Sequence, residues 1–408
     1  MPDIVDYATH AAYTTVYTSN GLWSAVKAAL PGDTIYLAPG AYTAMSMAGM
    51  NPAGMVTITS LDPSHPAVVA GLTLTNSSNL TFSNIELTPK AQGAYGITLG
   101  GDSNIRFDHL NIHASATVDG NAVLIRDSRN VSVTNSEIHN IGTGISYIDS
   151  DTVMLSGNRL HHIQSDGMHG GGTSNITITG NTFTDFSPKA GDHPDAIQFW
   201  TSGTTTSAHD ITITNNIITR GAGAAVQGIF LGNEKMLEYK NVTITGNAVV
   251  GGLYNGIFVV DASNAKIEGN LVQGYNDINS WIYLSKITTG VLDYNQATTF
   301  ALAKDNVGLN VHDNTKIVLQ PVGDLTVLNH WLNPQGLAAP TVPPESFDLS
   351  APPTSEALDA DASPLPEAFN PDAGSQPVTF EPEPEAPPTP DIFDPGASSI
   401  WSSTDGLI

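Results

Sequence analysis

The sequence predicts an all-β chain folded as a right-handed single-stranded parallel β-helix, with an N-terminal capping helix and a disordered acidic C-terminal tail. Three observations lead to this prediction. A short motif that closes on Asn recurs every 23 to 35 residues, and a second column of short strands precedes it. Charged residues make up only 13% of the chain, and Thr, Ser, Asn and Gly take their place. Self-similarity with such a period is typical of solenoids.

The recurring motif has the form Asn-Val-Thr-Ile-Thr-Gly-Asn, in which apolar and polar residues alternate over a short strand. One turn cannot bury its own apolar face, so its stability comes from its neighbours. Asn side chains stacked between turns can bond the neighbouring backbone, and we interpret them as a structural ladder. The closing residues are Asn158, Asn181, Asn216, Asn247, Asn270 and Asn295, separated by 23, 35, 31, 23 and 25 residues.

The second column fixes an expected register. It begins at Tyr95, Asn121, Thr143, Asp166, Asp195, Gln227 and Asn255. If Met168, Ile197, Ile229 and Ile257 point inward, alternation turns the residues one and three positions further along outward. The outward row is then Leu124, Arg126, Ser146, Ile148, His169, Gln198, Trp200, Phe230, Phe258 and Tyr283. The small residues just before this row predict a shallow trough; they are Gly144, Gly167, Ala196, Gly228 and Gly256.

Two turns are longer than the others. In the 35-residue turn the excess is expected between Phe186 and Asp195, and in the 31-residue turn around Gly221 to Gln227. Insertions in a solenoid project as loops from one face, which is commonly the binding face. The sequence therefore predicts that these loops form the rim of a groove.

The chain divides into three expected segments: residues 1–42 as cap and first strands, 43–331 as the β-helix, and 332–408 as a disordered tail. Asn20 to Leu30 reads as a short amphipathic helix, which is needed because an open β-helix end exposes strand edges and core. Residues 332–408 contain no Lys, Arg or His and are rich in Pro and acidic residues. That composition is typical of disorder.

The charge balance excludes some partners. The chain has 39 acidic and 14 basic residues and a formal charge of −25. We therefore expect no nucleic-acid partner and no membrane partner. There is no cysteine for disulfides or thiolate metal sites. Met1 to Thr15 has no basic segment followed by an apolar run. We expect an extracellular protein, carried in a virion or phage-like particle or exported without a cleavable signal peptide.

The run from Ala25 to Tyr42, which contains Pro-Gly-Asp-Thr-Ile and Pro-Gly-x-Tyr, resembles the start of pectate-lyase-like β-helix proteins. The later Asp-Gly-Ile-like and Asn-x-Thr-Ile-x-Gly-Asn turns are similar to the same superfamily, which includes polysaccharide lyases, mannuronan C-5 epimerases and phage tailspikes. This resemblance implies a β-helix over roughly residues 20 to 330 and a carbohydrate partner. It does not define the reaction, because such folds host binding, lysis, hydrolysis and epimerisation.

The candidate catalytic residues lie on two adjacent turns. Asp166 and Asp195 share a column, and neighbouring turns are about 4.8 Å apart. Two close carboxyl groups raise one pKa, which leaves one acid protonated and the other ionised, as glycoside hydrolysis requires. Glu234 is the candidate for a more distant partner. His169 or His193 could instead abstract a proton beside a uronate carboxyl, as a lyase or epimerase requires.

The candidate substrate-binding residues are Gln198, Trp200, Gln227, Phe230, Asn233, Asn255, Phe258 and Arg126. Sugar C–H faces stack on aromatic rings, and amides bond the hydroxyl groups. We expect no cofactor. The residues His169, His193, Asp166 and Asp195 leave a divalent metal as a minor alternative.

The leading hypothesis is a depolymerase of a surface or exo-polysaccharide, of the glycosidase type. One alternative is a non-catalytic receptor-binding spike of a phage or phage-like particle, in which a homotrimer is one arrangement and the C-terminal tail contacts particle proteins. The other alternative is a polysaccharide lyase or epimerase. Each uses the same polysaccharide-binding face, so the sequence alone does not choose among them.

Overall fold

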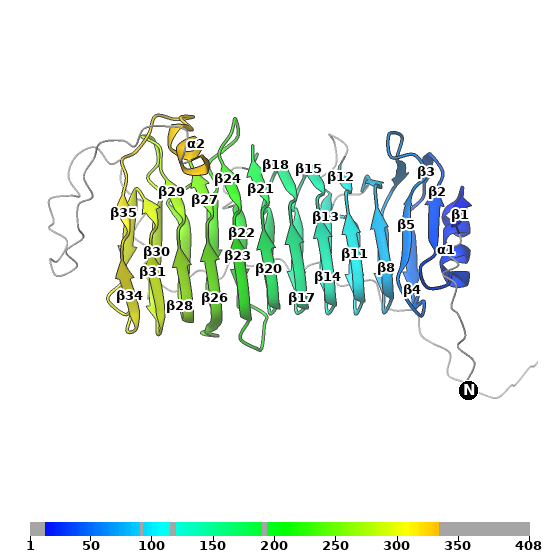
Figure 1. Ribbon diagram of the computed structural model, residues 1–408, viewed down its shortest axis with the longest axis horizontal. Helices are drawn as coiled ribbons and strands as arrows, with labels where there is room; N and C mark the ends of the chain where they lie inside the picture. The colour runs from blue at the N-terminus through cyan, green and yellow to red at the C-terminus, as the bar shows by residue number, and fades with distance from the viewer. Residues whose placement is uncertain (1–12, 90–92, 115–119, 190–193, 334–408) are drawn as a thin grey trace, which may run out of the picture. The chain divides into compact units, whose positions relative to one another are not determined.

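The computed structural model describes residues 13–89, 93–114, 120–189 and 194–333. In this part the chain coils into successive turns of parallel strands, and each full turn contributes one strand to each of three faces (Figure 1). The described residues contain two helices, α1 (Ser19–Ala28) and α2 (Thr326–Leu332). The predicted parallel β-helix is confirmed, and its strands stack in the expected register.

The first face carries the second column of the sequence. Its strands are β4 (Met45–Ala48), β7 (Leu72–Thr75), β10 (Tyr95–Gly100), β13 (Asn121–Arg126), β16 (Ile145–Ile148), β19 (Met168–Gly171), β22 (Asp195–Trp200), β25 (Gln227–Leu231), β28 (Asn255–Glu268), β30 (Trp281–Ile287) and β33 (Thr299–Leu302). The long strand β28 continues around the corner into the second face, so both faces count as one sheet of 23 strands.

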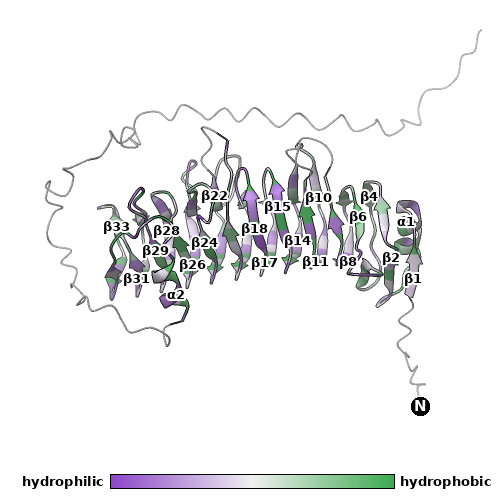
Figure 2. Ribbon diagram, turned by 90° about the horizontal axis from the view of Figure 1, so that it is seen from above, coloured by the Kyte–Doolittle hydropathy of each residue, from purple (hydrophilic) through white to green (hydrophobic). Residues whose placement is uncertain are grey.

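The second face carries the Asn-Val-Thr-Ile-Thr motif. Its strands are β1 (Tyr13–Val16), β2 (Thr34–Leu37), β5 (Val56–Ser60), β8 (Ser78–Ser83), β11 (Ser103–Asp108), β14 (Arg129–Thr134), β17 (Asp151–Ser156), β20 (Ser174–Thr179), β23 (His209–Thr214), β26 (Tyr239–Thr245), the end of β28, β31 (Gly290–Asp293) and β34 (Leu309–His312). Buried and more exposed residues alternate along these strands, as their sequences predict. Figure 2 shows the hydropathy of the residues along the coil.

The third face is a separate sheet of 12 shorter strands. They are β3 (Gly40–Tyr42), β6 (Ala67–Val69), β9 (Glu86–Leu87), β12 (Asn111–His113), β15 (Glu137–Ile141), β18 (Arg159–Ile163), β21 (Thr182–Thr184), β24 (Ile217–Thr219), β27 (Ala248–Val250), β29 (Leu271–Gln273), β32 (Gln296–Ala297) and β35 (Thr315–Lys316).

The predicted Asn ladder is present at the corner between the second and third faces. Asn158, Asn181 and their successors are at most 1% exposed. The Nδ2 and the backbone N–H of Asn181 both donate to Oδ1 of Asn216, each at 3.0 Å. Asn216 bonds Asn247 in the same way. Each Asn thus satisfies buried backbone groups of adjacent turns, and the structural interpretation is confirmed.

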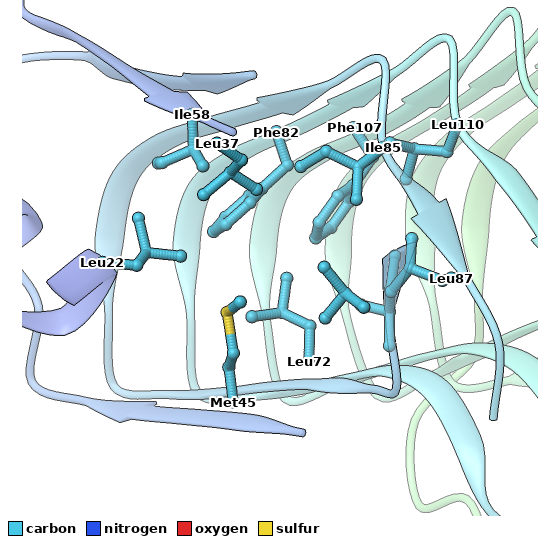
Figure 3. Close-up of a pocket in the computed structure, with 12 residues that line it drawn as sticks. Leu22, Leu37, Met45, Ile58, Leu72, Phe82, Ile85, Leu87, Phe107 and Leu110 are labelled. Carbon is cyan, nitrogen blue, oxygen red and sulfur yellow. The ribbon is translucent and has the colours of Figure 1, made fainter. Parts of the chain in front are cut away.

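Helix α1 covers the N-terminal end of the coil, as predicted. The Thr18 hydroxyl caps it by accepting the Gly21 N–H at 3.0 Å. Leu22 and Val26 point into the core. Figure 3 shows Leu22 facing Leu37, Met45 and the phenyl rings of the next turns, around an internal cavity of only about 10 Å³. The cap therefore closes a well-packed end.

The end of the β-helix differs from the prediction. Its last strand is β35, which ends at Lys316, so the coil stops before Trp331. Residues after Lys316 turn back, and α2 places Leu328 in a small apolar cluster with Tyr275 and Leu271. The segment from 317 to 331, which was expected to continue the coil, ends in this short helix. The predicted tail from 334 onward lies outside the described residues.

Candidate functional site

The outward row of the first face lies as the register predicted. Ser146 is paired with His169, His169 with Gln198, and Gln198 with Phe230 on consecutive strands. The row continues to Phe258 and Tyr283. Their inward neighbours, from Met168 to Ile257, are completely buried.

At the centre of this row, His169 is held from both sides. Its Nδ1 lies 2.9 Å from Oδ2 of Asp166, and its Nε2 lies 2.7 Å from the Ser146 hydroxyl. A carboxylate only accepts, so Nδ1 carries the proton and Nε2 accepts the proton of the Ser146 hydroxyl. The side chains of His169 and Asp166 are 20% and 15% exposed. The three residues form a Ser–His–carboxylate relay on the first face, in which Ser146 is buried and the other two side chains are partly exposed.

Asp166 also bonds the next turn. Its Oδ1 accepts the backbone N–H of Asp195 at 2.9 Å. Asp166 stands just before β19, three residues ahead of His169, so one carboxylate joins two turns and orients the imidazole. The two predicted acids are therefore neighbours, but they meet through a backbone group rather than through both carboxyl groups.

The Asp195 carboxyl group is enclosed. The residue is 1% exposed, and neither carboxyl oxygen has a hydrogen-bond partner among the residues that the structure describes. Burial, and secondly the Asp166 carboxylate, raise the pKa of Asp195 well above its ordinary value. The raised pKa agrees with the prediction that one acid of the pair keeps its proton. The enclosure does not agree with a carboxyl group that touches a sugar in this conformation.

Two glycines after His169 make room for aromatic side chains. A Cβ atom on Gly170 would lie 1.8 Å from the carbonyl oxygen of Tyr147 and 2.3 Å from its ring. The Tyr147 ring therefore passes beneath this turn, and its hydroxyl donates to the carbonyl of Gln198 at 2.7 Å. A Cβ atom on Gly171 would lie 2.9 Å from Nε1 of Trp200.

Trp200 closes the other side of the imidazole. Its ring meets that of His169 edge to face, with centroids 5.1 Å apart and planes at 81°. It is half-buried. Trp200 thus combines exposed apolar surface with a contact that orients His169, as the sequence predicted for its placement in the row.

The aromatic residues further along the row present edges instead of faces. Phe230 and Phe258 stack at 4.5 Å with an interplanar angle of 5°, and Phe258 stacks on Tyr283 at 4.8 Å and 10°. Neighbouring rings cover each other's faces. The predicted stacking of sugar faces on Phe230 and Phe258 stays a prediction; in the structure these rings stack on one another and offer an apolar strip of edges.

The structure also differs from the predicted trough. Gly144, Gly167 and Gly228 are small because of packing between turns. A Cβ atom on Gly144 would lie 2.0 Å from the carbonyl oxygen of Gly167, and one on Gly228 would lie 2.1 Å from that of Gly256. These positions face the core and the next turn, so they do not shape the outer surface.

Two predicted amide ligands are already used. Asn255 donates from Nδ2 to the Gln227 side-chain oxygen, and Trp281 donates from Nε1 to Oδ1 of Asn255 at 3.1 Å. Gln227 and Asn255 are 7% and 8% exposed. Their predicted role in binding a substrate stays a prediction; in this conformation their position in the column buries them between turns.

Glu234 and Asn233 lie at the opposite end of the strands from Asp195. The Glu234 Oε2 accepts the backbone N–H of Thr201 at 2.9 Å, and the Asn233 Oδ1 accepts the Thr201 hydroxyl at 2.9 Å. The strand from Asp195 to Trp200 rises about 3.3 Å per residue, roughly 16 Å in all. Glu234 is therefore not the second carboxyl group of a pair with Asp195, and both residues secure a turn.

The remaining candidates are Arg126, Gln198 and His193. Gln198 lies half-buried in the row beside His169, and Arg126 is exposed at the end of β13, two turns before β19. His193 lies outside the described residues. The insertion of the 35-residue turn also differs from the prediction, since it is divided between the loops on either side of β22.

Sequence reasoning placed Ser146 in the outward row but gave it no role. The signal was available, because Ser146 and His169 occupy the same register position on adjacent turns. Among the described residues, one group has the geometry to hold a metal ion, Asp293 with His312 and Asp313 at the C-terminal end of the coil. Asp166, His169 and Asp195 do not form such a group. No helix in the described ranges is long and apolar enough to cross a membrane.

Comparison with protein families agrees with this architecture. The model described as "Right handed beta helix region" matches residues 121–316, and the model described as "Periplasmic copper-binding protein (NosD)" matches residues 28–207. A search of curated proteins finds no match. The chain resembles the pectate-lyase-like right-handed parallel β-helix proteins, as its first strands predicted.

A search of solved structures finds chains that are similar to this one at low sequence identity. An alginate lyase from Paenibacillus sp. str. FPU-7 is 19% identical, over 74% of this chain and 98% of that chain, with a TM-score of 0.48. A surface adhesin of Streptococcus pneumoniae is 12% identical over 74% and 87%, with a TM-score of 0.47. A lacto-N-biosidase from Eubacterium ramulus is 12% identical over 76% and 68%, with a TM-score of 0.49.

Proposed function

We propose that this chain binds a surface or exo-polysaccharide along the outward row of the first face and modifies it enzymatically, with His169 as the proton-transfer group. The observation that carries the proposal is the placement of one imidazole between Asp166 and Ser146, within a row of polar and apolar side chains. A histidine whose Nδ1 is bonded to a carboxylate presents a basic Nε2.

The row offers chemistry that suits a sugar chain. Gln198 supplies an amide beside the imidazole, Trp200 supplies indole surface, and the edges of Phe230, Phe258 and Tyr283 extend an apolar strip over three further turns. Ring C–H groups contact such surface while amides bond hydroxyl groups. Consecutive turns are about 4.8 Å apart, close to the length of one sugar unit, so the row can follow a polymer.

The test is conversion of capsular and exopolysaccharide preparations by the full chain, followed by size chromatography and proton NMR of the polymer. His169→Gln is expected to lower conversion about 10²- to 10⁴-fold, the usual contribution of general acid–base catalysis. His139→Gln is the matched control, since that histidine lies on the third face. Unchanged conversion by His169→Gln contradicts the proposal.

Hydrolysis by the pair Asp166 and Asp195 is the second candidate. The raised pKa of Asp195 supports it, because a general acid must hold its proton near neutral pH. The enclosure of Asp195 opposes it. New reducing ends that disappear in Asp195→Asn would support hydrolysis by the pair, whereas full activity in that variant would exclude it.

A non-catalytic spike, with a homotrimer and particle contacts through the tail, is the third candidate. It predicts binding on a glycan array with no change in the polymer, and a trimer in sedimentation analysis. We also propose a location outside the cytoplasm. The match to a family described as periplasmic supports this location.

A further inference from the structure

We propose that Ser146 is the nucleophile of an acyl-transfer relay with His169 and Asp166, and that the substrate is a short-chain ester, such as an O-acetyl group, on the bound polysaccharide. Only the identity of the ester-bearing polymer rests on the function proposed above. The relay itself stands on the geometry of three side chains.

The two hydrogen bonds form a continuous path for a proton. The Ser146 hydroxyl oxygen is 2.7 Å from Nε2 of His169, and Nδ1 of His169 is 2.9 Å from Asp166. Activation of a serine requires a base within hydrogen-bond reach and a third group that orients this base. Both conditions are met, and Trp200 holds the imidazole ring from its other side.

Ser146 differs from the structural serines of the coil. Ser128, Ser136 and Ser150 stand at corners, where each hydroxyl donates to a carbonyl two residues earlier and accepts a backbone N–H of another turn. Ser146 stands in the middle of β16, where its hydroxyl bonds an imidazole of the next turn. The ladder of the solenoid does not account for this contact.

The reaction proceeds in two balanced halves. The Ser146 oxygen attacks the ester carbonyl carbon while its proton moves to Nε2 of His169. The sugar oxygen then leaves with that proton, and an acyl-serine remains. Water attacks this ester in turn, again giving its proton to Nε2, and the acid is released as Ser146 regains its proton. The Asp166 carboxylate holds Nδ1–H and stabilises the positive imidazole.

The burial of Ser146 restricts the acyl group. The residue is 1% exposed, whereas the side chain of His169 is 20% exposed. A carbonyl carbon must therefore approach the hydroxyl beside the imidazole edge, and a long acyl chain has no room there. This argues for acetyl over longer acyl groups.

The experiment treats the full chain with a fluorophosphonate probe, locates the label by peptide mass analysis, and measures hydrolysis of 4-nitrophenyl acetate and octanoate. We expect label on Ser146 and at least a tenfold preference for acetate. We expect at least a hundredfold slower labelling in His169→Gln and Asp166→Asn, which keep the serine. Ser132→Ala, on the second face, is the control and should label like the wild type.

Absence of label on Ser146, or acetate hydrolysis that persists in Ser146→Ala, overturns the proposal if these proteins melt like the wild type. Equal rates with octanoate overturn the size restriction. The assay needs no sugar. If it fails while His169-dependent polysaccharide conversion persists, the relay proposal falls and the proposed function stands. If Ser146 is labelled and acetate is hydrolysed but no polysaccharide is converted, the relay proposal stands and the proposed function falls.

Discussion

The stacked histidines of the third face and the single His169 of the first face have different surroundings. On the third face His113, His139 and His161 stack at 5.0 Å, one ring per turn, with nearly parallel planes. On the first face His169 stands alone in its column, with Ser146 before it and Gln198 after it. Its ring meets Trp200 edge to face and bonds two different partners.

The difference separates structural residues from candidate functional ones. A side chain repeated at each turn finds its partner in its own copy, as the stacked imidazoles and the buried Asn residues do. A polar side chain that occurs once in its column must be satisfied by unlike neighbours. In this chain the imidazole of His169 draws its partners from Asp166 and Ser146, and Gly170 on the same strand leaves room for the Tyr147 ring of the preceding turn.

The largest expected effect comes from a substitution in the packing beside His169. Gly170→Ala places a methyl group against the Tyr147 carbonyl and ring, and we expect a loss of about 3 kcal/mol in the free energy of unfolding. Gly100→Ala is the matched control, because a Cβ atom there meets nothing within 4 Å. Thermal melting of both variants measures this. Equal melting temperatures would show that the Tyr147 contact adapts without strain.

Asn216→Ala tests the buried Asn ladder. This substitution removes the amide that bonds Asn247 and the Ile178 carbonyl, and it leaves the Asn181 N–H without its acceptor. We expect a loss of about 1–3 kcal/mol. The exposed Asn51, which bonds the Asn76 carbonyl and the Ser78 hydroxyl, is the control, and Asn51→Ala should cost about 0.5 kcal/mol or less. Denaturant unfolding compares the two, and equal losses would contradict the buried ladder as the stronger element.

Asp195→Asn tests the enclosed acid. Because the pKa of Asp195 is raised in the folded state, the folded chain holds a proton that the unfolded chain loses above a pH of about 4. Stability is therefore lost as pH rises from that value toward the raised pKa, by about 1.4 kcal/mol for each pH unit in this interval.

Asn carries no ionisable group, so the variant should melt higher than the wild type at pH 8, and the difference should shrink toward pH 4. Melting curves across this range provide the measurement. A variant that is less stable than the wild type at pH 8 would show that Asp195 is ionised and has a partner in the folded protein.

The smallest expected effect concerns the stacked histidines. Burial, with the charges of His113 and His161, lowers the pKa of His139. The unfolded chain thus binds this proton first, and stability is lost as pH falls below about 6.5, the ordinary value. His139→Gln should reduce the loss of unfolding free energy between pH 8 and pH 5 by a few tenths of a kcal/mol. Melting curves at the two pH values measure this. An unchanged pH dependence would show that the stack does not couple these rings.

Much of the fold followed from the sequence because each turn repeats the same alternation of apolar and polar residues. Alternation over the short strands gave the register of the first face, including the pairing of His169 with Gln198, and the stacked Asn residues gave the buried ladder. The same reasoning did not give the contacts of residues that do not repeat. Gln227 and Asn255 bury their amides in each other, and Glu234 secures a turn beyond the end of the strand.

The sequence by itself determined the parallel β-helix, its capped beginning and the outward row, because a period of about one turn leaves only one way to bury every apolar face. Only the tertiary structure decided which members of the row act together. Contacts between turns join residues more than 20 positions apart, such as Ser146 and His169, and depend on the rotation of each side chain. Local spacing carries no information about that rotation, so enclosure of Asp195 and stacking of Phe230 on Phe258 emerged only from the packed coil.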